Sequence, residues 1–199
     1  MRKEEGWATC QQPVPVELPT TTETTNKCNT AEKGKSSASF VTDSLILDPI
    51  FSPRNITRIG TWNVRPLNQI EHLAQLLQEF DNYRLDILGL SEVRWMGSGC
   101  FNSANKAILF SGCDGRRERG VGFVLNKRAA NALVGWKPVN ERIITARFST
   151  KHVRITVIQV YAPTDNLEEG MKNNFYGLLQ NTIDETPRRD LRRGSSVRW

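Results

Sequence analysis

The stretch that decides the fold is Leu85-Asp86-Ile87-Leu88-Gly89-Leu90-Ser91-Glu92-Val93-Arg94-Trp95. Its first six residues are almost wholly apolar, which is typical of a short strand covered on both faces of a sheet. The strand delivers Ser91 and Glu92 to its carboxyl end. Layered α/β folds usually bind ligands at that end of their strands. The stretch therefore predicts a buried strand that carries a candidate site.

Strand-like and helix-like patterns alternate on both sides of this stretch. Strands are expected at 56–63, 107–110 and 120–125, with 96–118 otherwise loop. Apolar side chains recur on one helical face over 69–82, and Asn126 is a suitable N-cap for a helix over 127–134. This alternation indicates an α/β (α+β layered) domain.

A hairpin and a helix are expected nearer the C-terminus. The β-rich runs 142–148 and 153–161 suit an antiparallel hairpin. Asp165 and Glu168 form a capping-box pattern for a last helix that Pro187 ends. Its apolar stripe consists of Met171, Phe175, Leu178, Leu179 and Ile183.

Composition divides the chain into three parts. Residues 1–55 are expected to be a disordered segment, because 1–45 hold few large aliphatic residues to offset the entropy of ordering. Residues 56–190 are expected to fold, and 191–199 to form a basic tail without a strand. Lys and Arg number 27 against 21 Asp and Glu, giving a net charge of +6. This balance favours polyanionic partners, DNA among them.

The four cysteines show no C-x-x-C pair and no nearby His at metal-ligand spacing, which argues against zinc. We expect reduced thiols without a disulfide partner, as in an intracellular protein of the nucleus or cytoplasm. No apolar run follows the N-terminus as in a secretory signal. No run approaches the ~20 apolar residues of a membrane span.

Five motifs occur in a fixed order along the chain. They are T-W-N-V at 61–64, L-D-I-L-G-L-S-E-V-R-W at 85–95, G-V-G-F at 120–123, R-I-I-T-A-R-F at 142–148 and V-Y-A-P at 160–163. In this order and spacing they resemble the endonuclease/exonuclease/phosphatase superfamily. They are most similar to endonucleases of non-LTR retrotransposons and to craniofacial development protein 2-like sequences, over roughly 57–190.

The resemblance implies a four-layered α/β sandwich of two similar halves, with the active site between two sheets. Of this sandwich the chain is expected to hold an incomplete half with a mixed sheet. The resemblance also implies phosphodiester or phosphomonoester hydrolysis with a divalent metal, usually Mg²⁺. Asn63 is then expected to hold the active-site network, Glu92 to bind the metal, and Tyr161 to hydrogen-bond the scissile phosphate. Arg142 matches an arginine near the substrate strand.

Each of these residues also has an ordinary structural interpretation. Asn63 could cap a turn. Glu92 could pair with Arg94 or Arg65 at the surface. Tyr161 could be an edge tyrosine with its hydroxyl in water. We assign two tryptophans to packing and neither histidine to catalysis: Trp62, Trp95, His72 and His152.

The chain departs from the family pattern after Asp190. Family members continue with an apolar strand ending in G-D-x-N and, further on, an S-D-H-type end that supplies the base. Neither occurs here. We therefore expect a chain truncated after the N-terminal half, whose first sheet has one face open to water and whose hydrolase activity is very low or absent.

Three functions remain to be weighed. The first is a DNA endonuclease-type domain of retrotransposon origin. The second is a non-catalytic nucleic-acid-binding or vestigial protein, and the third, a phosphatase, is disfavoured by T-W-N-V-R and S-E-V-R-W. For the first, the side chains of Asn63, Glu92 and Tyr161 are expected at one rim of a single mixed sheet.

Overall fold

The computed structural model describes residues 50–52, 56–64, 67, 70–150, 154–187 and 190–197. Most of the segment expected to be disordered lies outside these residues. Ile50, however, is 1% exposed and belongs to the core, where Phe51 stacks edge-on against Phe148. The ordered part therefore already includes Ile50, upstream of the expected boundary at residue 56.

The first sheet has five strands in the order β1-β2-β5-β4-β3. β1 and β2 are parallel, and the other neighbours are antiparallel. Every residue of β2 and β5 is buried, as the continuous apolar runs predicted. The bounds are β1 Ile59–Asn63, β2 Ile87–Ser91, β3 Ser98–Ser103, β4 Lys106–Ser111 and β5 Val121–Leu125.

The second sheet has four strands in the order β6-β7-β8-β9. The expected hairpin is confirmed, since β7 and β8 pair antiparallel, and β9 then pairs parallel with β8. The bounds are β6 Leu133–Asn140, β7 Ile143–Ser149, β8 Arg154–Tyr161 and β9 Leu191–Val197.

Three helices complete the described part of the chain. They are α1 Ile70–Asn82, α2 Lys127–Ala132 and α3 Glu169–Glu185. The N-cap prediction for α2 is confirmed, because the Asn126 side chain accepts a bond from the Ala129 N–H. The capping-box prediction for α3 is wrong: Glu168 is its N-cap and makes no side-chain capping bond. None of the described helices is long and apolar enough to cross a membrane.

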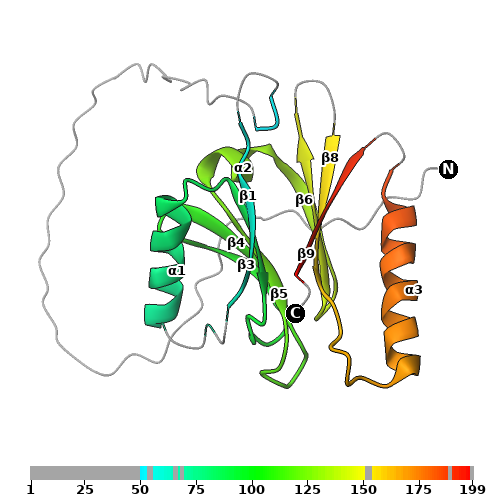
Figure 1. Ribbon diagram of the computed structural model, residues 1–199. Coiled ribbons are helices and arrows are strands. Elements are labelled where there is room, and N and C mark those ends of the chain that lie inside the picture. The colour runs from blue at the N-terminus through cyan, green and yellow to red at the C-terminus, as the bar shows by residue number, and fades with distance from the viewer. Residues whose placement is uncertain are drawn as a thin grey trace, which may run out of the picture. The chain divides into compact units, whose positions relative to one another are not determined.

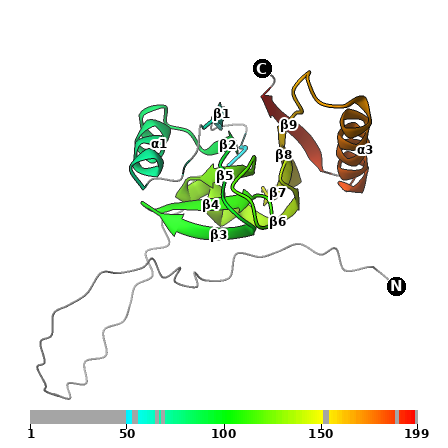
Figure 2. The ribbon, with the colours of Figure 1, turned by 90° about the horizontal axis from the view of Figure 1, so that it is seen from below.

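The described elements form four layers, with one helix outside each sheet (Figures 1 and 2). Leu76, Leu77 and Phe80 of α1 cluster with Leu88 and other residues on the outer face of the five-stranded sheet. Phe175 of α3 clusters in the same way on the four-stranded sheet. Between the sheets, a shared core buries Phe123, Leu125, Ile144, Phe148 and Val157.

This arrangement corrects two expectations about the sheets. The fold class, an α/β layered fold with a mixed sheet, is confirmed, but there are two sheets rather than one. The inner face of the first sheet is not open to water, because the second sheet covers it. The described residues thus already contain the helix–sheet–sheet–helix order of a four-layered sandwich.

The segment after Asp190 is also a strand, contrary to expectation. β9 pairs along β8 from Leu191 opposite Ile155 to Val197 opposite Tyr161. Asp190, just before it, has a side chain only 2% exposed and accepts bonds from Arg147 Nε (2.7 Å) and Thr156 Oγ1 (3.1 Å). This buried ion pair fixes the start of β9 against β7 and β8.

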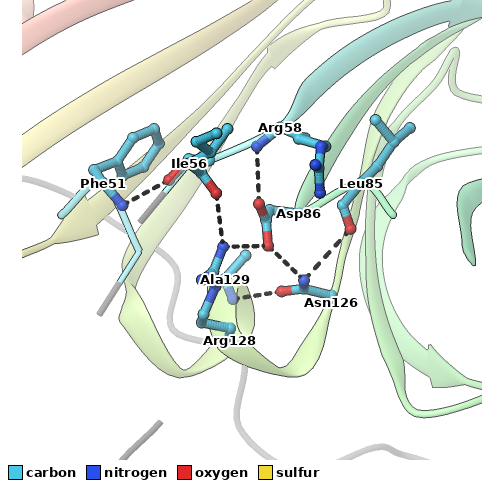
Figure 3. Close-up of polar contacts among 9 residues, drawn as sticks. Phe51, Ile56, Arg58, Leu85, Asp86, Asn126, Arg128 and Ala129 are labelled. Atoms are coloured by element: carbon cyan, nitrogen blue, oxygen red, sulfur yellow. Dashed lines mark hydrogen bonds and ion pairs between the residues drawn. The ribbon is translucent and has the colours of Figure 1, made fainter. Parts of the chain in front are cut away.

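A second polar network fixes the opposite end of β2 from Glu92 (Figure 3). Asp86 Oδ2 accepts a bond from the backbone N–H of Arg58 at 2.8 Å. Its Oδ1 accepts bonds from Asn126 Nδ2 and Arg128 Nη2, each at 2.7 Å. The Asp86 carboxylate therefore joins the residues that precede β1, β2 and α2. Its described partners stabilise the fold.

The cysteines differ from expectation at one position. Cys113 is a free thiol, whereas Cys100 is disulfide-bonded. Among the described residues, no group of three or more His, Cys, Asp or Glu side chains could hold a metal ion by itself.

Candidate functional site

Three strand ends meet around the carboxylate of Glu92. Asn63 is the last residue of β1, Glu92 follows β2, and Tyr161 is the last residue of β8. Asn63 Nδ2 donates to Glu92 Oε1 at 3.1 Å, and the Tyr161 hydroxyl donates to the same oxygen at 2.8 Å. The structure thus brings together the three residues that the sequence singled out, although Tyr161 arrives from the second sheet.

Glu92 also forms one of the two surface ion pairs that its ordinary structural interpretation allowed. Arg94 Nη2 lies 3.3 Å from Glu92 Oε2, and the Arg94 side chain is 41% exposed. An ion pair this exposed contributes little to stability. Arg65, the other proposed partner, lies outside the described residues. Glu92 therefore has one surface partner and two partners that belong to strand ends.

The backbone around Glu92 is held in an unusual conformation. Glu92 has φ +63° and Arg94 has φ +55°, both in the left-handed region. Such residues cost of order 1–3 kcal/mol each and cluster at functional sites. The segment is held by bonds from Val93 N to Gly120 O (3.3 Å) and from Arg94 N to Arg119 O (2.7 Å). Residues 119–120, which lead into the neighbouring strand β5, thus hold Glu92 in position.

Gly120 fits this position because it lacks a side chain. Its φ is +102°, and an added Cβ would lie 2.8 Å from Val93 Cγ2. A real Cβ would therefore push against the residue that follows Glu92. The first glycine of the G-V-G-F motif is thus required by the site's backbone.

Arg142 joins the site through Tyr161. Its Nη1 donates to the Tyr161 carbonyl at 3.1 Å, and its guanidinium lies 5.0 Å from the centre of the Tyr161 ring. Burial, followed by the nearby charge of Arg119, lowers the pKa of Arg142. The fourth residue predicted from the sequence therefore contacts the cluster but does not touch Glu92 in any described hydrogen bond.

The protonation of the cluster follows from these contacts. Burial raises the pKa of Glu92, but hydrogen bonds from Asn63, Tyr161 and Arg94 outweigh it, and the pKa is lowered overall. Burial, then the bond to Glu92, raises the pKa of Tyr161. At neutral pH the cluster thus holds an ionised carboxylate and a protonated phenol that can donate.

One buried residue that the sequence analysis did not single out supports the cluster from the core side. Gln159 is fully buried on β8, and its Nε2 donates to Ser91 Oγ at 3.1 Å and to Thr61 Oγ1 at 3.5 Å. This contact joins the sheets two residues before Tyr161 on β8 and one residue before Glu92. The available signal was a glutamine inside the apolar run of β8.

The donor set suits a hard divalent cation. Magnesium in proteins is commonly bound through one or two carboxylates, with waters completing its shell. Glu92 supplies one ionised carboxylate, and the adjoining Asn63 Oδ1 is buried without a hydrogen-bond partner. A buried acceptor oxygen left unpaired is costly, and a cation or its water would satisfy it. The residues present therefore fit Mg²⁺.

The expectations for the two tryptophans and the two histidines are met only in part. Trp95 packs against Phe101 and Phe110 and donates to the Leu67 carbonyl, as expected. Trp62 is 42% exposed, so its side chain packs only in part. Trp62 lines a hollow of about 510 Å³ together with Asn63 and His72, which places His72 nearer the strand ends than expected. His152 lies outside the described residues.

Comparison with curated proteins shows related sequences. Over 133 residues the chain is 44% identical to craniofacial development protein 2 from Bos taurus and from Tragulus javanicus. The match covers 67% of this chain but only 22% and 23% of those proteins. The chain thus spans under a quarter of the length of these relatives. No family model matches.

Comparison with solved structures shows the fold. An AP endonuclease from Archaeoglobus fulgidus aligns with TM-score 0.54 and 20% identity, over 71% of this chain and 56% of that one. A D. rerio TDP2 humanized by 14 mutations aligns with TM-score 0.52 and 12% identity, over 70% and 65%. These likenesses concern the fold alone.

Proposed function

The chain is a homologue of craniofacial development protein 2 with the endonuclease/exonuclease/phosphatase fold, and from that premise we propose a Mg²⁺-dependent phosphodiesterase site of the DNA endonuclease type. The observation that carries the proposal is the convergence of Asn63, Glu92 and Tyr161 from three strand ends. The order of the five motifs favours a retrotransposon origin. The net charge of +6 favours a polyanionic substrate.

Each residue has a role that its contacts allow. Glu92, ionised and held by three donors, provides the carboxylate for the metal. Bound Mg²⁺ supplies charge stabilisation on phosphate oxygens. The Tyr161 hydroxyl, kept protonated, can donate to a phosphate oxygen in place of Glu92 Oε1. Asn63 orients the carboxylate, and Arg142 places a positive charge beside Tyr161.

The cluster holds no partner suited to general-base work. Among the described contacts of Asn63, Glu92 and Tyr161, no second carboxylate and no histidine occurs. Hydrolysis needs an oriented water and a group to take its proton, and such groups act as a unit. We therefore expect these 199 residues to bind metal and phosphate but to hydrolyse DNA very slowly or not at all.

The second candidate function is non-catalytic binding of nucleic acid. It is favoured because the described contacts of the cluster include no second carboxylate and no histidine, and by the basic charge of the chain. In this case the cluster would serve as a polar contact for phosphate without chemistry. Metal binding at Glu92 distinguishes the two candidates, because plain electrostatic binding requires no such site.

The test measures metal binding and cleavage separately. Mn²⁺, used as a paramagnetic probe for Mg²⁺, should bind the protein, and Glu92→Gln should weaken that binding at least tenfold. Glu185→Gln, on the exposed face of α3, is the control and should bind Mn²⁺ as wild type does. Equal binding by all three proteins would contradict a Glu92 metal site.

Cleavage is then followed as plasmid nicking in Mg²⁺. Wild type should not exceed a Glu92→Ala control. Mg²⁺-dependent nicking that disappears in Glu92→Ala would show that the chain is active, and that other residues supply the base.

A further inference from the structure

The Gln159 side chain lies where the two sheets meet on the core side of the candidate site. It is fully buried on β8, two residues before Tyr161 and on the same face of the strand. Its Nε2 donates to Ser91 Oγ on β2 at 3.1 Å and to Thr61 Oγ1 on β1 at 3.5 Å. Gln159 therefore links β8 to β1 and β2, the three strands whose ends form the site.

Two acceptor oxygens near this link are buried and have no hydrogen-bond partner among the described residues. They are Gln159 Oε1 and Asn63 Oδ1. A buried acceptor without a partner has lost its hydration and gained no bond in exchange. Turning the Gln159 amide over does not remove this cost, because one end of the amide is then still unpaired. The two oxygens therefore require a donor that the described side chains do not supply.

Both oxygens belong to side chains that adjoin Ser91. Asn63 is the register partner of Ser91 in the parallel pair of β1 and β2, and Gln159 is bonded to Ser91 Oγ. Asn63 Nδ2 is turned toward Glu92 Oε1 at 3.1 Å, which leaves Oδ1 on the other side of the amide. A small donor next to Ser91 is therefore placed to serve both oxygens.

The inner face of β2 has space at this point. Gly89 is the register partner of Thr61 and, by the alternation of side chains along a strand, shares the inner face with Ile87 and Ser91. Ile87 belongs to the core between the sheets. Because Gly89 has no side chain, the volume beside the Thr61 hydroxyl is not filled from β2.

Water is the donor that suits these neighbours. It has two hydrogens for two acceptors, and internal waters typically make about three hydrogen bonds. The hydroxyls of Thr61 and Ser91 accept from Gln159, so each keeps a hydrogen that it can donate to a water. The polar groups around the link thus match the hydrogen-bonding capacity of one water molecule.

We propose that one internal water joins Gln159 Oε1 to Asn63 Oδ1, and that Gln159 is thereby a positioning residue for the metal at Glu92. The inference rests on the proposed function and deepens its metal site. The water donates one hydrogen to each oxygen, and so holds the Asn63 amide with Nδ2 toward Glu92. A carbonyl oxygen has two lone pairs, so Asn63 Oδ1 is still able to face the metal. Groups behind a ligand commonly tune metal affinity by about tenfold or more.

A purely structural role for Gln159 leads to a different expectation. If Gln159 only joined the sheets, its replacement would lower Tm and leave the metal affinity of the folded protein unchanged. If Gln159 acts on Asn63 through water, an apolar side chain of similar shape lowers the metal affinity and costs little stability. It removes an unpaired acceptor together with the bonds of Nε2.

The first measurement uses the unsubstituted, metal-free protein. Rotating-frame NMR cross-relaxation between water and the side-chain amide protons of Gln159 and Asn63 detects a long-lived internal water. We expect a water contact at both amides, with the sign opposite to that of chemical exchange. The contact at Asn63 should disappear in Gln159→Met, although the Ser91 and Thr61 hydroxyls remain.

The second measurement compares Mn²⁺ binding and Tm among variants. Gln159→Met should weaken Mn²⁺ binding about tenfold, with little change in Tm. Thr145→Val is the matched control, because Thr145 is 3% exposed on β7 of the same sheet and its Oγ1 also has no partner among the described residues. Its register partner, Ile158, packs on the outer face of that sheet. Thr145→Val should bind Mn²⁺ as wild type does.

Contrary results are distinguishable. Lack of a water contact at Gln159 in wild type overturns the proposal, as does equal Mn²⁺ binding by wild type and Gln159→Met. Equal weakening by Gln159→Met and Thr145→Val would show a general effect of core substitution and overturns it as well. If Gln159→Met does not fold, Gln159→Leu takes its place. Wild type that binds no Mn²⁺ overturns the proposed metal site too, whereas binding that responds to Glu92→Gln but not to Gln159→Met overturns only the role of Gln159.

Discussion

Tyr161 and Glu92, 69 residues apart in sequence and attached to different sheets, share a hydrogen bond of 2.8 Å. The phenol donates and the carboxylate accepts, so the bond is stronger when Glu92 is ionised. Together with the bond from Asn63 it keeps the pKa of Glu92 below its usual value of 4.5.

Tyr161→Phe should therefore raise the pKa of Glu92. A carboxylate whose folded-state pKa is lowered adds stability above its unfolded pKa, and loses it as pH falls through the folded pKa. The stability that wild type gains from Glu92 should thus be complete above pH 4.5 and decline as the pH falls through the lower folded-state pKa, and the Tyr161→Phe variant should gain less stability from Glu92. Carboxyl carbon chemical shifts measured over a pH series check the direction. An unchanged Glu92 titration would mean that the bond is not formed in solution.

Gly120→Ala should destabilise the fold by roughly 1–3 kcal/mol, because the new Cβ meets Val93 at 2.8 Å in a left-handed backbone. Gly170→Ala is the control, since a Cβ there meets nothing within 4 Å. It lies within α3 and should stabilise by up to about 1 kcal/mol. Urea unfolding of both variants measures the difference. Equal stabilities would show that residues 119–120 do not constrain Glu92.

Asp190→Asn should cost about 3–5 kcal/mol, because it neutralises the carboxylate that the buried Arg147 guanidinium contacts at 2.7 Å. Asp165→Asn, at a fully exposed carboxylate paired loosely with Lys172, should leave the stability unchanged within error. Denaturant unfolding compares the two. Amide exchange should also speed up in β9, which begins directly after Asp190. Protection of β9 as in wild type would separate the strand from the ion pair.

Asn126→Ala should cost about 1 kcal/mol through loss of the α2 cap, with a further loss because Asp86 keeps one donor fewer. Asn173→Ala, exposed on α3, should stay within about 0.5 kcal/mol of wild type. Thermal unfolding checks both. A cost for Asn126→Ala no larger than that of the control would contradict the network in Figure 3.

Sequence reasoning located β1, β2, β4, β5, β7 and β8 but missed β3, β6 and β9. β2 and β5 are specified by their own side chains. β3, Ser98–Ser103, is polar and glycine-containing, and β6 holds Pro138 beside a register shift on an edge strand. β9, with the sequence LRRGSSV, pairs only because β8 offers an edge and Asp190 is fixed by Arg147. Tertiary pairing, which no local pattern records, decides these three strands.

The candidate site was likewise only partly predictable from the sequence. Asn63, Glu92 and Tyr161 were predictable because strand ends converge in layered folds, and the structure brings them into contact. Their catalytic roles stay predictions. Gln159 and Arg119 were not predicted, since their importance depends on which strand lies opposite them. The left-handed backbone at Glu92 likewise follows from the pairing with residues 119–120.

The division of the site between two sheets also orders its assembly in time. Gln159 meets Ser91 across 68 residues, and Tyr161 meets Glu92 across 69. Contacts between such distant positions carry a large loop-closure entropy and form slowly. A chain that has folded α1 onto the five-stranded sheet therefore still lacks Tyr161, and the cluster is complete only after the sheets dock. We therefore expect the Glu92–Tyr161 bond to form late in folding, after the two sheets have docked.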